Sequence, residues 1–396
     1  MSLLQALQAR AVPFVAMRHD LHRHPELGLQ EFRTSELLAN QLQSWGYSVT
    51  RGLATTGLVA QLQRGSGSKR LGLRADMDAL PIHEANDLAH CSVHAGVMHA
   101  CGHDGHSAML MAAAQYIAQE VDFSGTLNLI FQPAEEHPGG AKIMIEEGLF
   151  ERFPCDAIFA AHNMPGIPAG QLVFIEGPAM ASSDDVTITL TGVGGHGAMP
   201  HRAQDPIVAA AAIVMTLQTI VSRNVDPQHT AVITVGSLVA GKANNVIPAS
   251  ARLELSVRSL DRDVRDLLHA RIMQLATAQA QSLGVQAHID YKRDYPVLVN
   301  TAEETELARQ VGIELLGAER VTRQGRPLTG SEDFAFMLEH SPGSYLMIGN
   351  GTGEGAGEGQ PAHACMVHNP GYDFNDDILP VGAAFWALLT QRYLKD

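Results

Sequence analysis

The chain has 396 residues, 45% of them hydrophobic, and a formal net charge of -15 at pH 7. This length exceeds what one hydrophobic core usually serves, so we expect a globular protein of two domains. The acidic charge argues against a nucleic-acid partner, because phosphates need a basic footprint. It also means that an anionic substrate needs a local positive charge, from a metal ion or an arginine.

The cellular setting is predicted from the cysteines and the N-terminal pattern. Four cysteines in a chain of this length form no disulfide framework and favour a reducing compartment: Cys91, Cys101, Cys155 and Cys365. Residues 1–26 lack the unbroken apolar core of a signal peptide and predict an amphipathic helix. Its apolar face carries Leu3, Leu4, Leu7 and Ala11. No apolar run approaches the length of a membrane span. We therefore expect a cytoplasmic protein that contacts no membrane.

Strands and helices alternate over the following segment. Helices are expected within residues 35–47 and 106–120. Apolar strands end at Asp76, Pro133 and Pro165. This alternation predicts a largely parallel sheet that is covered by helices.

Residues 182–292 show a different order of elements. The pattern predicts a strand at 184–195, a helix at 205–223, strands at 229–241 and 250–259, a helix at 261–284 and a strand at 285–292. Asp205 is the expected cap of the first of these helices, with Pro206 in its first turn. The order β-α-β-β-α-β is that of a ferredoxin-like domain.

The alternation of strands and helices then returns to the end of the chain. The predicted elements are a helix at 301–317, a strand at 343–349 and a helix at 380–394, with a glycine-rich loop at 350–364. We therefore expect an α/β fold. A mostly parallel-sheet domain sandwiched by helices (1–181 and 293–396) carries an inserted ferredoxin-like α+β domain (182–292).

The stretch HACGHDGHSAM, residues 99–109, concentrates metal-binding side chains just before a helix. Cys101 and His103 flank Gly102, and a glycine permits the bend that two ligands so close together require. Thiolate and imidazole both bind first-row metals. Such a pair alone is more often structural than a metal site.

Other acidic and histidine side chains follow predicted strands. Glu135 and Glu136 lie just past one strand and His162 just past the next, while His368 lies in a loop near the C-terminus. Asp76 and Asp78 also end a strand. In open α/β sheets, ligands bind outside the carboxyl ends of the strands. The pattern therefore predicts a metal site at that edge of the sheet.

Eight sequence blocks in this order resemble the dinuclear metal amidohydrolases that include hippuricase, aminoacylase and plant auxin-conjugate hydrolases. The blocks are HRHPELGLQEF, LRADMDALPI, HACGHDGHSAML, FQPAEE, GGHGAMPH, NVIPASARLELSVRS, TGSEDFAFM and HNPGYDFND. The resemblance covers residues 22–376, and bacterial glutamate carboxypeptidases are more distant relatives. The HACGHDGH and PAEE blocks are specific to the aminoacylase and hippuricase branch.

The resemblance implies a role for individual residues. The implied metal ligands are Cys101, His103, Glu136, His162 and His368. Glu135 matches the general base, Asp78 an aspartate that supports the metal site, and His196 a histidine that reaches the active site of the partner subunit. Asn245 and Arg258 match residues that bind the substrate's carboxylate, and Gly330 and Ser331 line the pocket in relatives. Five further histidines in these blocks are expected to be supporting or structural: His22, His24, His99, His106 and His201.

The expected reaction is the metal-dependent hydrolysis of N-acyl or N-aroyl amino acids to a carboxylic acid and a free amino acid. Two divalent ions can share a water, lower its pKa and polarise an amide carbonyl. The resemblance favours manganese, whereas the thiolate also suits zinc. Two alternatives stay open: a dipeptidase or small carboxypeptidase on the same scaffold, and a catalytically idle metal-binding protein. The resemblance implies that residues 1–181 and 293–396 form the catalytic domain and that residues 182–292 form a lid and dimerisation domain. The expected partners are therefore a small-molecule substrate and a second copy of the chain in a homodimer through the lid domain.

Overall fold

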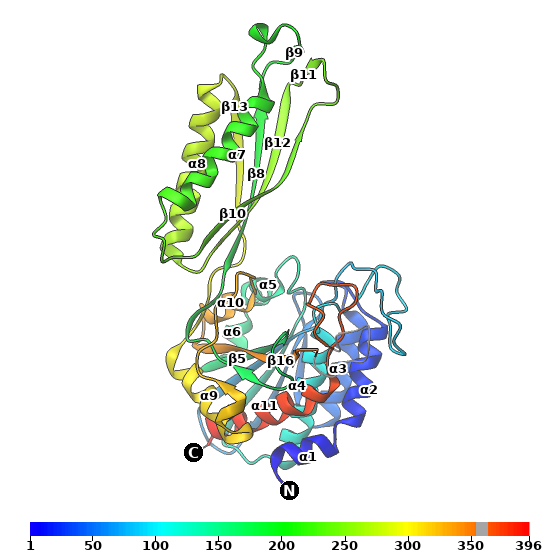
Figure 1. Ribbon diagram of the computed structural model, residues 1–396. Helices are drawn as coiled ribbons and strands as arrows, with labels where there is room; N and C mark the ends of the chain where they lie inside the picture. The colour runs from blue at the N-terminus through cyan, green and yellow to red at the C-terminus, as the bar shows by residue number, and fades with distance from the viewer. Residues whose placement is uncertain (354–362, 396) are drawn as a thin grey trace. The chain divides into compact units, whose positions relative to one another are not determined.

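Figure 1 shows the computed structural model, which describes residues 1–353 and 363–395. The chain divides into two compact units. The first unit contains residues 1–177, 299–326 and 336–396, and the second contains residues 178–298 and 327–335. The predicted glycine-rich loop at 350–364 lies mostly outside the described residues.

The first unit is built on an eight-stranded sheet with the order β1-β2-β4-β3-β5-β16-β6-β15. The four central strands β4, β3, β5 and β16 are parallel to one another, whereas β1, β2 and β6 pair antiparallel with a neighbour. The bounds are β1 Ser48–Leu53, β2 Gly57–Arg64, β3 Arg70–Asp76, β4 Gly125–Gln132, β5 Ala157–Pro165, β6 Leu172–Val173, β15 Val321–Thr322 and β16 Gly343–Gly351. Because central parallel strands are covered on both faces, β3 and β4 are buried almost throughout.

Helices cover this sheet, and two of them are buried over most of their length. α4 (His103–Glu120) and α11 (Leu379–Tyr393) pack against each other and present apolar side chains on all sides, as interior helices do. The other helices of the first unit are α1 Leu3–Ala9, α2 Val12–Arg23, α3 Phe32–Ser44, α5 Gly140–Glu146, α6 Leu149–Arg152 and α9 Ala302–Leu316. Short 3₁₀ turns lie at Ala318–Arg320 and Asp376–Ile378, and helix α10 spans Phe334–Leu338.

The second unit is a four-stranded antiparallel sheet with two helices on one face (Figure 1). Its elements are β8 Ser182–Thr191, α7 Pro206–Arg223, β10 Ala231–Ala240, β12 Ser250–Ser259, α8 Arg262–Ser282 and β13 Gln286–Arg293. The strand order β10-β12-β8-β13 and the element order are those of a ferredoxin-like domain. A small ladder pairs β9 (Gly195–His196) with β11 (Val246–Ile247), and a 3₁₀ turn spans Pro200–Arg202.

The fold-class prediction is confirmed by this architecture. The chain passes between the units in β7 (Gly177–Met180) and β14 (Leu298–Asn300), which pair with each other. The predicted cap of α7 is also present, because Asp205 Oδ1 accepts a hydrogen bond from the Ile207 main-chain N–H at 2.8 Å.

Helix α7 matches the helix predicted at 205–223, but its length and apolar composition approach those of a membrane span, which the sequence analysis did not expect. It has 18 residues with a mean hydropathy of 1.5, so by length and composition it is the one helix in the described residues that could cross a membrane. One face of α7 packs on the four-stranded sheet through Ala209, Ala210, Ile213, Leu217 and Ile220, which are fully buried. A helix that packs on a sheet passes the same test, so the finding is weak evidence for a membrane span.

Two local predictions are wrong. The N-terminal segment forms two helices, because Pro13 lacks the N–H that would continue α1 and instead stands in the first turn of α2. The hairpin of β1 and β2 was not predicted, since β1 is largely exposed and carries few apolar residues. Neither difference changes the strands that deliver the candidate site.

Candidate metal centre and active site

The predicted ligands of the first unit are delivered by the ends of neighbouring elements. Cys101 stands two residues before α4, and His103 is the first residue of that helix. Gly102 between them has φ +93, the left-handed conformation that glycine adopts without strain. A side chain there would also collide with Asn163 and Tyr372, since its Cβ would lie 2.4 Å from each. Local backbone geometry therefore explains why these two ligands flank a glycine.

The remaining ligands come from β4, β5 and a loop. Glu136 follows β4 as predicted. His162 lies inside β5 and not past its end, because that strand continues to Pro165. His368 lies between β16 and α11 with φ +66. All three belong to the same unit as Cys101 and His103.

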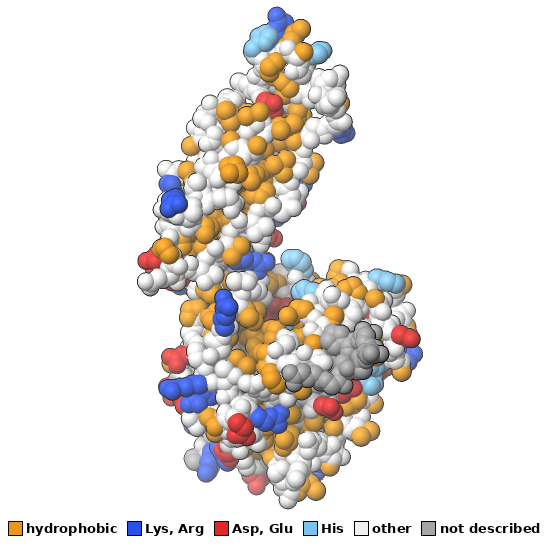
Figure 2. Space-filling model, viewed as in Figure 1, with side chains coloured by type: hydrophobic (Ala, Val, Ile, Leu, Met, Phe, Trp, Pro, Cys, Tyr) orange, Lys and Arg blue, Asp and Glu red, His pale blue; other side chains and the backbone are white. Residues whose placement is uncertain are grey.

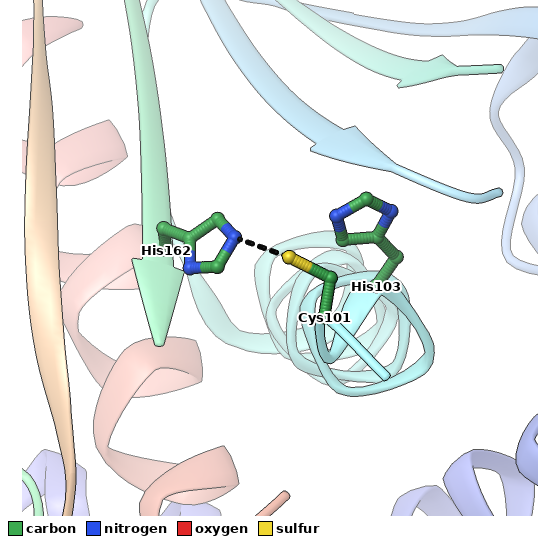
Figure 3. Close-up of side chains that lie close together, drawn as sticks. All are labelled: Cys101, His103 and His162. Atoms are coloured by element: carbon green, nitrogen blue, oxygen red, sulfur yellow. Dashed lines mark hydrogen bonds between the residues drawn. The ribbon is translucent and has the colours of Figure 1, made fainter. Parts of the chain in front are cut away.

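The structure gathers these five side chains into two ligand groups that share one residue. Cys101, His103 and His162 form one group, and Cys101, Glu136 and His368 form the other, with the ligand atoms of each group within 4.8 Å of one another. Figure 3 shows His103 and His162 on either side of the Cys101 sulfur, which lies 3.3 Å from His162 Nε2. His368 Nε2 lies 2.9 Å from Glu136 Oε1. The Cys101 sulfur can therefore bridge two metal positions.

Hydrogen bonds hold the imidazoles of His103 and His162 in fixed orientations. His103 Nδ1 lies 2.9 Å from the Asp78 carbonyl oxygen and 3.1 Å from Asp78 Oδ1, and His162 Nδ1 lies 2.6 Å from the Asn163 carbonyl oxygen. Each Nδ1 therefore donates, which leaves Nε2 as the ligand atom. His103 Nε2 is buried and makes no hydrogen bond to the described residues. A buried polar atom without a partner is costly, and a metal ion would satisfy it.

The electrostatics of the cluster also fit a cation. Burial, together with the Glu136 and Glu135 carboxylates, raises the pKa of the Cys101 thiol well above its usual value. Burial disfavours the charged form of His103, but Asp76 and Asp78 outweigh it and raise the pKa of His103 to about 10. This surplus of negative charge around buried groups is what a divalent ion compensates, and a bound metal deprotonates a coordinating thiol. The donor set of sulfur, nitrogen and carboxylate oxygen suits first-row divalent metals.

The two predicted carboxylates beside the ligands also lie at this centre. Glu135 is 7% exposed, and its carboxylate belongs to a group with His103 and Glu136 whose ligand atoms lie within 4.8 Å of one another. Asp78 is buried, and its Oδ2 accepts a hydrogen bond from the Glu136 main-chain N–H at 2.9 Å. Asp78 therefore orients two candidate ligands at once. It holds the imidazole of His103 and the main-chain N–H of Glu136.

Asp76 and His106 form a buried hydrogen-bonded group next to β5. Asp76 Oδ1 lies 2.6 Å from His106 Nδ1, while Arg74 donates to Asp76 Oδ2 at 2.7 Å. His106 Nε2 in turn accepts the main-chain N–H of Asn163 at 3.0 Å. The sequence analysis expected His106 to be a supporting or structural residue. The structure places it against the residue that follows ligand His162.

A second buried network surrounds Arg18 on α2. Its guanidinium lies 2.8 Å from Asp376, 3.2 Å from Asp373 and 3.6 Å from Asp104, the residue after His103. His22 lies 2.9 Å from Asp104. These partners are up to 358 residues apart in sequence, so no local pattern could reveal them. The network links helix α2 to two of the segments that carry candidate ligands, the one with His103 and the one with His368.

The predicted residues of the second unit form two separate places within it. His196 is exposed and pairs with Val246 in the β9–β11 ladder, and Asn245 precedes Val246 and accepts from the Gly197 main-chain N–H at 2.8 Å. Arg258 donates to the Ser331 hydroxyl at 2.7 Å, and Ser331 follows Gly330. His201, the other histidine of this block, is exposed in a 3₁₀ turn.

These two places lie at opposite ends of one strand. The chain enters β12 at Ser250, shortly after Asn245, and Arg258 is the last residue but one of that strand. Eight residues of extended chain span roughly 27 Å at 3.4 Å per residue. Within one chain, Asn245 and Arg258 are therefore too far apart to hold the same small carboxylate.

Comparisons with known proteins agree with this site. Residues 72–392 match the family described as Peptidase family M20/M25/M40. Hippurate hydrolase of Campylobacter jejuni is 43% identical, over 96% of this chain and 97% of that protein. N-acetyl-L-cysteine deacetylase of Bacillus subtilis is 37% identical, over 85% of this chain and 80% of that protein.

A solved structure gives the same result for the whole fold. The YXEP protein of Bacillus subtilis, described as a dinuclear metal binding peptidase from the M20 family, aligns with a TM-score of 0.82 at 30% identity. The alignment covers 98% of this chain and 99% of that one. The family match and these relatives confirm the resemblance that the sequence blocks indicated, and the chain belongs to peptidase family M20/M25/M40.

Proposed function

We propose that this protein hydrolyses the amide bond of N-acyl or N-aroyl amino acids, with hippurate-like and N-acetyl amino acids as the leading substrates. The observation that carries the proposal is the pair of ligand groups that share Cys101, with the Glu135 carboxylate beside them. The relatives named hippurate hydrolase and N-acetyl-L-cysteine deacetylase act on amides of this kind by name, which supports the same substrate class here.

The residues of the first unit divide into two roles in this proposal. Cys101, His103, Glu136, His162 and His368 hold two divalent ions, which when bound activate a water and polarise the amide carbonyl. Glu135 accepts the proton of the attacking water and delivers it to the nitrogen of the leaving amino acid. Glu135 and Glu136 both stand in the turn after β4, and they can divide these tasks because only Glu136 belongs to a ligand group that contains Cys101.

The metal is manganese in our proposal, with zinc as the alternative. Imidazole and carboxylate ligands suit manganese, while a thiolate that belongs to both ligand groups would favour zinc. The four cysteines are all free, which supports a reducing cytoplasmic compartment.

A homodimer through the second unit completes the proposal. Figure 2 shows hydrophobic side chains spread over the visible face of this unit. The exposed apolar residues of the unit include Val208 and Met215 of α7 and Leu238 and Val239 of the edge strand β10. An unpaired edge strand and an exposed apolar patch are typical of an interface. The separation of Asn245 from Arg258 gives a second argument, because a partner subunit can supply one end of β12 while the chain's own unit supplies the other.

The substrate class is tested by a hydrolysis screen. N-benzoylglycine and N-acetyl amino acids should be hydrolysed after loading with manganese, and chelation should abolish turnover until metal is restored. Simple dipeptides and N-formyl amino acids belong in the same screen. Preferred hydrolysis of dipeptides would replace the proposal with a dipeptidase, and no turnover of any substrate by protein with two bound metals would favour the idle metal-binding alternative.

The bridging position of Cys101 predicts an unequal loss of metal among ligand variants. Cys101→Ser should weaken both metal positions, because its sulfur belongs to both ligand groups, whereas His368→Ala should weaken only one. Each lost ligand should lower metal affinity by at least the roughly 10- to 100-fold that supporting residues contribute. Metal content per chain after dialysis measures this difference.

The control for this experiment is Cys155→Ser, which removes a thiol that belongs to neither ligand group and should leave both metals bound. If Cys101→Ser lost only as much metal as His368→Ala, the sulfur would serve one position and not two.

A further inference from the structure

The sequence block HRHPELGLQEF contains a buried carboxylate that the proposed mechanism does not use. Glu31, the residue before α3, is completely buried. Its Oε1 accepts a hydrogen bond from the main-chain N–H of Ala134 at 2.9 Å, and its Oε2 accepts one from the Thr56 hydroxyl at 2.5 Å. Both oxygens of the side chain are therefore bonded to groups in other segments of the chain.

Ala134, which donates its N–H to Glu31, has a backbone conformation that alanine rarely adopts. It has φ +53, in the left-handed region, and lies directly before Glu135. Its carbonyl oxygen accepts the main-chain N–H groups of Gly139 and Gly140 at 3.1 and 2.8 Å. A strained residue keeps such a conformation only when its surroundings hold it there. Here Glu31 holds the N–H side of Ala134, and the turn at 139–140 holds the carbonyl side.

A second carboxylate holds the chain on the other side of Glu135. Asp78 Oδ2 accepts the main-chain N–H of Glu136 at 2.9 Å, and Asp78 also holds the ring of His103. Asp78 therefore acts on two candidate ligands. The hydrogen bonds of Glu31 go to Thr56 and Ala134, and neither of these is a candidate ligand. The two carboxylates thus hold the residues on either side of Glu135. Asp78 holds the candidate ligand Glu136, and Glu31 holds Ala134.

We propose that Glu31 is a positioning residue for Glu135, because its hydrogen bond to the Ala134 N–H holds the left-handed turn that aims the Glu135 carboxylate at the reacting water. This inference rests on the proposed role of Glu135 as the base. Misplacement of a reacting group by about 1 Å can cost on the order of 10²-fold in rate, so a distant residue that fixes this turn affects turnover.

Glutamine is the conservative replacement that the geometry allows. Burial raises the pKa of Glu31 to about 7. A proton on Oε2 would face Thr56 and leave Oε1 free to accept from Ala134. Glutamine reproduces this arrangement, with its carbonyl toward Ala134 and its amide toward the Thr56 hydroxyl. Alanine removes both hydrogen bonds. Aspartate keeps the carboxyl group, but its side chain is one methylene shorter, so that group lies farther from the Ala134 N–H.

The expected result is a loss of kcat without a loss of metal. Glu31→Ala and Glu31→Asp should lower kcat by about 10²-fold, with KM and metal content close to those of the unmodified protein. Glu31→Gln should restore most of the turnover. Thr56→Val, which leaves the bond to Ala134 intact, should stay closer to the unmodified protein than Glu31→Ala. Should Glu31→Ala fold poorly, as circular dichroism would reveal, Glu31→Asp and Glu31→Gln still give the comparison.

A double-variant cycle separates positioning from general damage. In a Glu135→Gln background, Glu31→Ala should reduce the residual rate little further, because Glu31 acts through Glu135. An equal loss in both backgrounds, a loss of metal in proportion to activity, or full turnover by Glu31→Ala and Glu31→Asp would each overturn the inference. Full turnover by Glu135→Gln alone would instead overturn the base assignment of the proposed function.

Discussion

Replacing Glu135 by glutamine should lower kcat by about 10²- to 10⁴-fold while both metal ions stay bound. Glutamine has the shape of glutamate but cannot take a proton from the attacking water at neutral pH. The Glu135 carboxylate lies within 4.8 Å of the ligand atoms of His103 and Glu136, but it belongs to neither of the two groups that share Cys101. Steady-state kinetics and metal content per chain, measured on the same preparation, give the result.

The adjacent glutamate provides the matched control. Glu136→Gln should lower both metal content and turnover, because Glu136 is a ligand of one position. The two variants differ by one position in sequence and make the same chemical change. Turnover near the unmodified level by metal-loaded Glu135→Gln protein would remove Glu135 from the mechanism. Loss of metal by both variants alike would make Glu135 a ligand and leave the base unassigned.

The strands of the sheet and the clustering of the candidate ligands could be predicted because both follow local rules. Hydrophobic runs stopped by polar or proline residues indicate apolar strands that end at Asp76 and just before Pro133, and candidate site residues follow those ends. The spacing Cys-Gly-His also follows a local rule, since Gly102 takes φ +93. His162 was expected just past the end of its strand. It lies inside β5, because that strand continues through Asn163 and Met164 to Pro165.

The buried contacts of Arg18 and Glu31 could not be predicted in the same way. Arg18 meets Asp376 and Glu31 meets Ala134 across 358 and 103 residues of sequence, respectively. Such contacts depend on the packing of α2 and of the loop before α3 against distant segments. Sequence periodicity describes one element at a time and carries no information on these pairings. The roles of the buried side chains of Arg18 and Glu31 can be inferred only when their distant partners, Asp376 and Ala134, are known.

In the second unit, the distances between residues limit which of the roles implied by the family one chain can combine. His196, Asn245 and Arg258 were assigned together, and yet β12 separates Asn245 from Arg258 by most of its length. If all three act on one substrate, they come from two subunits. This requirement leads to the prediction with the sharpest test, since it demands activity from a mixture of two inactive proteins.

Mixed dimers of Glu135→Gln and His196→Ala chains should regain activity that neither homodimer has. His196 is exposed on β9, and the resemblance to the family implies that it reaches the active site of the partner subunit. We propose that its imidazole donates a hydrogen bond there to the oxyanion that forms on the scissile carbonyl. Loss of such a donor costs about 10²- to 10³-fold in rate, so both homodimers should be nearly inactive. In a mixed dimer, the His196→Ala chain keeps its own Glu135 and receives His196 from the other chain, so one of its two sites is complete.

The amount of recovered activity is also fixed by this arrangement. Random pairing of equal amounts makes half of the dimers mixed, and one complete site in each of these gives about one quarter of the unmodified activity. Unfolding the two proteins together and refolding them, or co-expressing them with different tags, produces the mixture. A mixture of Glu135→Gln with the double variant Glu135→Gln, His196→Ala should stay inactive, because no site in it contains Glu135. If His196 acted within its own chain, every site in the first mixture would lack one group, and verified mixed dimers would show no recovery.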